Sequence, residues 1–141
     1  MFGDMTLVLV KPDGVLMGNV SAISVVYKKS GFEVLFDSPI RFTMNDAKEF
    51  YSEHKEKFYF CGTILSLCSD MSHVLILRGD DAIKRVRKLN GPTKPDEAPP
   101  GTIRQDFRSA GGPFNTVHSS DSQESFEREY MIVRAVLKRS E

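Results

Sequence analysis

Residues 6–11, with the sequence TLVLVK, constrain the fold most because they form a nearly continuous apolar run that Pro12 ends. A strand that is apolar on both faces is typical of the centre of a sheet with layers on both sides. Proline stops such a strand because it has no N–H to donate. We therefore expect a central strand over this run, with Lys11 at its exit.

The composition is that of one globular domain over residues 1–141. The chain is 40% hydrophobic and carries 19 Lys+Arg against 19 Asp+Glu. A chain of this length can bury a core without disulfides or a structural metal, and its zero net charge argues against a nucleic-acid partner. No apolar run approaches the length of a membrane span, and the first residues lack the pattern of a secretory signal. We expect a cytoplasmic protein with no membrane partner, in which Cys61 and Cys68 are reduced and mostly buried.

Apolar spacing predicts alternating strands and helices before residue 90. Thr43 should cap a helix over 44–54, and Asp80 a helix that turns Ile83, Val86 and Leu89 inward. The remaining predicted elements are a helix over 18–30, a strand over 32–36, a helix over 58–68 with Tyr59, Ile64, Leu65 and Cys68 in the core, and a strand over 72–79.

A last helix is expected after a capping box formed by Asp121 and Glu124. Its inner face should carry Phe126, Tyr130, Val133 and Leu137. Glu129 lies on the flank of this apolar face, where an acid needs a partner. Residues 134–141 read as a frayed tail.

The interval 90–114 interrupts the alternation, because it holds five of the seven prolines and four glycines. A loop of this length in a compact domain is functional or disordered. Since this one also carries Thr93, Arg104 and Arg108, we interpret it as a binding loop, with disorder as the alternative.

Two sets of residues suggest chemistry. His54 lies in a polar run and His73 begins a strand, whereas His118 closes a short extended piece over 115–118 and is either functional or structural. Lys11, Arg87, Arg104 and Arg108 suit polyphosphate recognition, although a solvated basic face is an alternative for their neighbours in 84–88. Because neither GxxxxGK[ST] nor GxGxxG occurs, a nucleotide would be held without a P-loop. The spacings for a zinc site and for a GxSxG hydrolase are also absent from the sequence.

Three motifs in order resemble the nucleoside diphosphate kinase family: VKPDGV at 10–15, LNGPTKPDEAPPGTIRQDF at 89–107 and NTVHSSDSQES at 115–125. The segment 50–60 fits as well, and the similarity extends from Thr6 to about Val133. The resemblance implies an α+β, ferredoxin-like fold with a four-stranded antiparallel sheet covered by helices. This replaces the parallel sheet that alternation alone suggests. It also implies a homo-oligomer, either a hexamer or a tetramer.

The activity implied by the resemblance is transfer of the γ-phosphoryl of a nucleoside triphosphate to a nucleoside diphosphate, by ping-pong kinetics through a phosphohistidine. His118 matches the nucleophile and Glu129 the acid that orients it. Tyr51 and Ser120 match positions beside them, and Tyr59 matches the aromatic that stacks on the base. Mg²⁺ would arrive with the nucleotide, with Asp121 as an outer partner and no direct protein ligand. The positions that match phosphate or sugar contacts are Lys11, Arg87, Thr93, Arg104 and Asn115.

The chain departs from the family pattern at three places. Ser119 stands where glycine is usual, Phe58 where proline is usual, and Met17 where arginine is common. The competing hypothesis is a catalytically silent module of the same fold that binds nucleotides or scaffolds a partner. Intact Lys11 and His118 argue against it, since a sensor needs no nucleophile.

Overall fold

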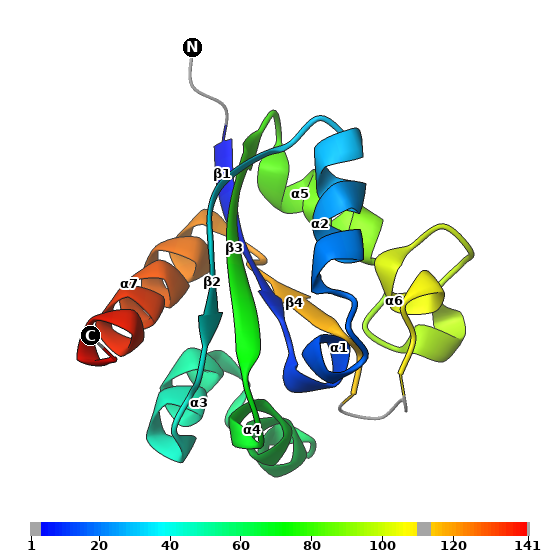
Figure 1. Ribbon diagram of the computed structural model, residues 1–141. Coiled ribbons are helices and arrows are strands. Elements are labelled where there is room, and N and C mark those ends of the chain that lie inside the picture. The colour runs from blue at the N-terminus through cyan, green and yellow to red at the C-terminus, as the bar shows by residue number, and fades with distance from the viewer. Residues whose placement is uncertain (1–3, 110–113, 141) are drawn as a thin grey trace.

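The protein forms a four-stranded antiparallel sheet covered by helices on both faces (Figure 1). The computed structural model describes residues 4–109 and 114–140. Its strands follow the order β2-β3-β1-β4. The elements are β1 (Asp4–Val10), α1 (Pro12–Leu16), α2 (Val20–Lys29), β2 (Glu33–Ile40), α3 (Met44–Phe50), a 3-10 turn (Ser52–His54), α4 (Phe60–Cys68), β3 (Ser72–Gly79), α5 (Ala82–Asn90), a 3-10 turn (Pro95–Glu97), α6 (Ile103–Asp106), β4 (Val117–Ser119) and α7 (Gln123–Arg139).

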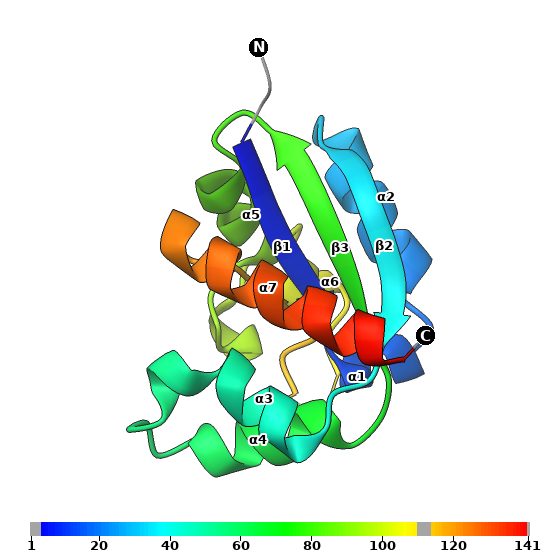
Figure 2. The same ribbon diagram turned by 90° about the vertical axis from the view of Figure 1, so that its left-hand side faces the viewer.

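The core consists of two layers separated by the sheet. On β1, Leu7 and Leu9 face a cluster that includes Phe50, Phe126 and Val133. The alternate residues Val8 and Val10 face a second cluster, which Ile23, Tyr27, Val86 and Ile103 complete. Figure 2 shows α7 crossing one face of the sheet, with α2 and α5 on the other. The central position expected for residues 6–11 is therefore confirmed, as is the antiparallel sheet that the resemblance implies.

Several predicted helix boundaries are wrong for local reasons. The helix expected over 44–54 ends at Phe50, because Tyr51 leaves helical geometry and a 3-10 turn follows. The helix expected from residue 58 begins at Phe60. The N-cap residue of α5 is Asp81, in a left-handed conformation with φ 48°, and not Asp80. At α7 the cap is Ser122, whose hydroxyl accepts from the Ser125 N–H, so the Asp121–Glu124 box does not form.

The predicted inner faces of α4 and α7 also need correction. Tyr59 and Leu65 are exposed, and Cys61, expected to be buried, is exposed as well. On α7, Tyr130 is exposed, and Ile132 and Val136 are buried instead.

The prediction of a frayed tail over 134–141 is wrong for the residues of this range that the structure describes. Helix α7 continues to Arg139, whose guanidinium donates to both Asp46 carboxylate oxygens at 3.0 and 2.7 Å. Glu141 at the end of that tail, and residues 110–113 of the expected binding loop, lie outside the described residues. The described part of the loop holds the 3-10 turn and α6, which favours an ordered segment over the alternative of disorder. Among the described helices, none is long and apolar enough to cross a membrane.

Candidate active site

His118 lies at the middle of the edge strand β4, against helix α7. Its Nε2 is 2.9 Å from Glu129 Oε2, and the other carboxylate oxygen of Glu129 accepts from Ser120 Oγ at 2.7 Å. The Glu129 side chain is 3% exposed. An ionised carboxylate only accepts hydrogen bonds, so the proton of the imidazole is on Nε2. Nδ1 thereby keeps its lone pair.

Two aromatic rings enclose the imidazole. Phe50 and Tyr51 meet the His118 ring edge-on, with centroids 5.0 and 5.2 Å away. Burial, together with the nearby Glu129 charge, raises the pKa of Tyr51. The Tyr51 phenol therefore stays protonated. From Tyr51 a row of rings leads outward through His54 at 6.1 Å to Tyr59, a further 6.4 Å away. Tyr59, half exposed, stands at the outer end of this row.

Lys11 is buried at the exit of β1, where the sequence places it. It is 2% exposed, and its Nζ donates to Asn115 Oδ1 at 3.0 Å. Desolvation lowers the pKa of Lys11 to about 8; the Asp13 carboxylate opposes this shift and the Arg104 charge adds to it. A further negative charge nearby would favour the protonated form of this ammonium.

Arg104 joins the loop after α5 to strand β4. Its guanidinium donates to the backbone oxygens of Gly91 at 2.5 Å, Val117 at 2.8 Å and Asn115 at 3.3 Å. Burial lowers the pKa of Arg104. A guanidinium has five N–H donors, and three of them are used in these bonds to described residues. The side chain borders a cavity of about 490 Å³ that Arg87, Lys88, Gly91, Pro92, Thr93, Pro99, Thr102 and Ser119 also line.

The backbone that carries Asn115 and His118 is held in a strained turn. Thr116 is fully buried and has φ 73°, a left-handed value that a β-branched residue rarely adopts. The Val117 N–H closes a three-residue turn by donating to the Asn115 oxygen at 2.8 Å. Asp13 Oδ2 accepts the Thr116 N–H at 3.0 Å and the Ser109 hydroxyl at 2.6 Å. Such strain costs about 1–3 kcal/mol and persists where surrounding contacts fix the geometry.

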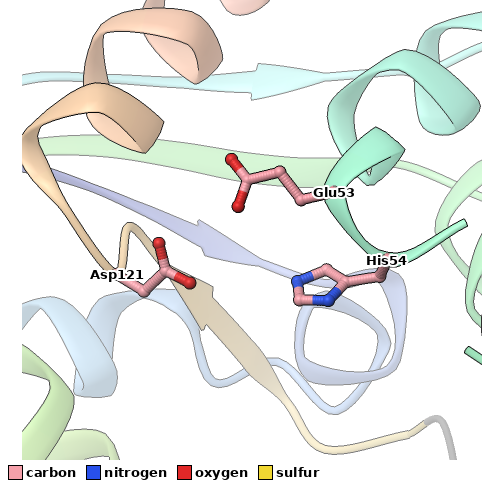
Figure 3. Close-up of side chains that lie close together, drawn as sticks. All are labelled: Glu53, His54 and Asp121. Atoms are coloured by element: carbon pink, nitrogen blue, oxygen red, sulfur yellow. The ribbon is translucent and has the colours of Figure 1, made fainter. Parts of the chain in front are cut away.

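Three side chains that could hold a cation come together where α3, its following turn and the start of α7 meet. One ligand atom from each of Glu53, His54 and Asp121 lies within 4.8 Å of the others (Figure 3). Ser125 Oγ bonds to both carboxylates, at 2.9 Å to Glu53 and 2.7 Å to Asp121. The Ser125 bond lowers the pKa of Asp121 against the effect of burial. Burial acts to raise the pKa of Glu53, but hydrogen bonds from Arg128 and Ser125 outweigh it and lower that pKa. Both groups are therefore anionic.

The structure brings the predicted site residues into two linked groups. The first holds His118, Glu129, Ser120 and Tyr51. In the second, Asn115 accepts from Lys11 and donates to the Thr93 oxygen at 3.1 Å, while Arg87, Thr93 and Arg104 border one cavity. Tyr59 and Asp121 stand at the margin of the first group. Residues 115–118 connect the two groups.

Sequence reasoning missed four contributors. His54 was expected to be solvated, but it is half buried beside Glu53 and Asp121. Glu53, Arg128 and Asp13 are brought to the site only by tertiary contacts. Their sequence positions give no signal of this, because charged residues are usually solvated.

The chain is similar in sequence to a known family of enzymes. The family model described as nucleoside diphosphate kinase matches residues 4–135. A nucleoside diphosphate kinase from Staphylothermus marinus is 43% identical over 128 residues, covering 91% of this chain and 90% of the relative. One from Methanocaldococcus jannaschii is 39% identical over 127 residues, with 90% of each chain covered.

Two solved structures extend the similarity to three dimensions. The crystal structure of the Aquifex aeolicus nucleoside diphosphate kinase superposes with a TM-score of 0.88 at 35% identity, covering 92% of this chain and 94% of that chain. A nucleoside diphosphate kinase from Halobacterium salinarum in complex with CDP gives 0.86 at 32% identity, covering 92% of this chain and 86% of that chain. The chain therefore belongs to the nucleoside diphosphate kinase family of phosphotransferase enzymes.

Proposed function

We propose that the protein transfers the γ-phosphoryl of a nucleoside triphosphate to a nucleoside diphosphate through a phosphohistidine at His118. The observation that carries this proposal is the buried Glu129 carboxylate bonded to His118 Nε2. A histidine that only packs in a core needs no such acid. A histidine that must react through Nδ1 needs its other nitrogen held in one protonation state.

The first half-reaction is an in-line substitution at phosphorus. The Nδ1 lone pair attacks the γ-phosphorus, an N–P bond forms, and the P–O bond to the β-phosphate breaks with its electrons leaving on the nucleoside diphosphate. Positive charge develops on the imidazole, and the Glu129 carboxylate stabilises it through Nε2–H. The second half-reaction reverses these steps with a different nucleoside diphosphate, which restores the free histidine.

Phosphate binding is assigned to the buried cations and their neighbours. Lys11 would act as a point charge, and Arg104 would use the two N–H groups that its bonds to the described residues do not occupy. These groups would stabilise the transferring charge where no P-loop exists. Arg87, Thr93 and Asn115 would complete the contacts to the phosphates and the sugar.

Tyr59 is assigned to the nucleobase. Its ring is 42% exposed, at the end of the aromatic row that starts beside His118. Stacking on an aromatic face tolerates any base, which suits an enzyme that exchanges phosphoryl groups between different nucleotides. The CDP complex of the Halobacterium salinarum relative supports nucleotide binding on this fold.

Mg²⁺ is assigned to the bound nucleotide. The Glu53 and Asp121 carboxylates fit it as partners through water, because Mg²⁺ prefers oxygen and keeps several waters, whereas the His54 nitrogen is a poor match. The ion would neutralise charge on the phosphates. A hexameric or tetrameric assembly and a cytoplasmic location stay predictions. So does the assignment of residues 1–141 to a single domain.

The test is a transfer assay with Mg²⁺, ATP and GDP, in which GTP formation is followed for the wild type and two variants. His118→Ala should lose essentially all transfer, since it removes the reacting nitrogen. His73→Ala is the matched control, because His73 lies on the inner strand β3 and its Nε2 is 2.8 Å from Asp37 Oδ1 on the edge strand β2; it should retain transfer. Nucleotide binding without GTP formation by the wild type would instead support the silent module.

A further inference from the structure

Three buried polar side chains form a line across the layer between α2, α5 and β4. The Tyr27 hydroxyl donates to Asn90 Oδ1 at 2.5 Å, and Asn90 Nδ2 donates to Ser119 Oγ at 3.0 Å. Tyr27 and Asn90 have no exposed surface and Ser119 is 4% exposed. Buried polar groups are costly unless they are paired. Because each polar group needs a partner, the hydrogen bonds run in one direction, from Tyr27 to Asn90 and from Asn90 to Ser119.

The direction follows from the two ways in which an amide can be oriented. With the Asn90 oxygen toward Tyr27, the tyrosine proton is satisfied and the unused donor is the Ser119 hydroxyl. With the amide reversed, Ser119 would donate to Asn90, and the Tyr27 proton would be left unpaired in the apolar core. An unsatisfied buried donor is costly, so the first orientation is favoured. Burial raises the pKa of Tyr27, which keeps the proton on the phenol.

The Ser119 hydroxyl proton has no acceptor among the residues that the structure describes. Ser119 borders the cavity of about 490 Å³ together with Arg87, Thr93 and Arg104. On strand β4, His118 and Ser119 point to opposite faces of the sheet. The serine therefore reaches the cavity from the α5 side, and the nucleophile stands on the side of α7.

We infer that Ser119 is a phosphate-binding residue, whose hydroxyl donates to a phosphoryl oxygen of the nucleotide in the cavity beside α5. Asn90 and Tyr27 are positioning residues, since they act only by turning the Ser119 proton toward that cavity. The inference deepens the proposed function and rests on it. It assigns a role to the Ser119 side chain, at a position where the family usually has glycine and therefore no side chain.

The test measures affinity for inorganic pyrophosphate and for ADP by calorimetry, together with a thermal melt of each variant. A hydrogen bond to a charged group contributes about 1.5–3 kcal/mol, so Ser119→Ala should raise both dissociation constants by about tenfold or more. Tyr27→Phe should raise them in the same direction, because Ser119 can then donate to Asn90. Ser72→Ala is the matched control: Ser72 is a buried strand serine whose Oγ has no partner among the described residues.

Each outcome separates this inference from the proposed function. A folded Ser119→Ala variant that binds both probes within twofold of the wild type would overturn the role of Ser119 and leave the proposed function standing. Weaker binding by Ser72→Ala to the same extent would also overturn it, since the loss would then not be specific to the cavity. A wild type that binds neither probe would overturn the proposed function and this inference with it.

Discussion

Lys11 is the residue whose burial has the clearest consequence for pH dependence. Its pKa is lowered to about 8 by desolvation, so the free enzyme loses this charge as the pH rises above that value. We expect kcat/KM for ATP to fall above about pH 8, with a slope approaching one decade per pH unit. Because bound phosphates favour the charged form, kcat should fall only at higher pH. A kcat/KM that stays level to pH 9.5 would show that the charge of Lys11 is not required.

Glu129 makes the second prediction at the residue scale. Its carboxylate accepts from both His118 and Ser120, and Glu129→Gln replaces one of these acceptors with an NH₂ donor. Hydrogen bonds to charged groups contribute about 1.5–3 kcal/mol. We therefore expect single-turnover phosphoryl transfer to slow by about 10- to 100-fold, measured by quenched flow. Unchanged transfer in a folded variant would show that the acid does not orient the imidazole.

At the scale of elements, Arg128 fastens the end of α3 to α7. It donates to the backbone oxygens of Glu49 and Phe50 at 3.1 and 3.0 Å and to the Glu53 carboxylate at 2.7 Å. These contacts fix the segment that carries Tyr51 and His54 beside the helix that carries Glu129. Arg128 is therefore a positioning residue, which holds the segment of Tyr51 and His54 against α7.

Replacing Arg128 by methionine keeps the aliphatic stem and removes these bonds. We expect Arg128→Met to lower the free energy of unfolding by about 1–3 kcal/mol, measured by urea denaturation. Arg134→Met is the control, because Arg134 lies on the same helix, is exposed and, among the described residues, stacks on Tyr130 without a hydrogen bond; its effect should stay within about 0.5 kcal/mol. Equal effects of the two substitutions would contradict the fastening role.

The last turns of α7 belong to the core. Val136 is 2% exposed and packs in the cluster around Leu9 and Phe50. Removing two methyl groups with Val136→Ala should cost about 2 kcal/mol, at about 0.8 kcal/mol for each buried carbon plus a cavity cost. Met131→Ala, at a position that is 60% exposed, should cost far less. A melting temperature unchanged by Val136→Ala would mean that these turns do fray.

For the whole molecule, local patterns find the two inner strands but not the arrangement of the sheet. The strands expected over 6–11 and 72–79 are found because they are apolar on both faces, although β1 runs over Asp4–Val10. The strand expected over 32–36 extends over Glu33–Ile40, and alternation alone suggests a parallel sheet where the sheet is antiparallel. Helix α1 escapes detection because its five residues, Pro12–Leu16, are too short to show a period. The tail is misjudged because the bonds from Arg139 to Asp46 join residues 93 apart in the sequence, which no local pattern reports.

In the site, too, local patterns identify some residues, and tertiary contacts bring in the others. Its motifs point to Lys11 and His118 because these residues lie in distinctive short segments, whereas Glu129 stands out as an acid on the flank of the apolar face of the last helix. The Glu53–His54 side of the site depends on how α3 packs against α7, so spacing alone could not find it. The line from Tyr27 to Ser119 likewise depends on three elements meeting across one layer.

The central claim, a covalent phosphohistidine at His118, is tested most directly by the intact mass of the protein. After incubation with Mg²⁺ and ATP, we predict the gain of one phosphoryl group, which is acid-labile as expected for an N–P bond and is lost when GDP is added. The adduct should be absent from His118→Ala and present in His73→Ala. A wild type that forms GTP from ATP and GDP without ever gaining this mass, or an adduct that persists in His118→Ala, would contradict the account.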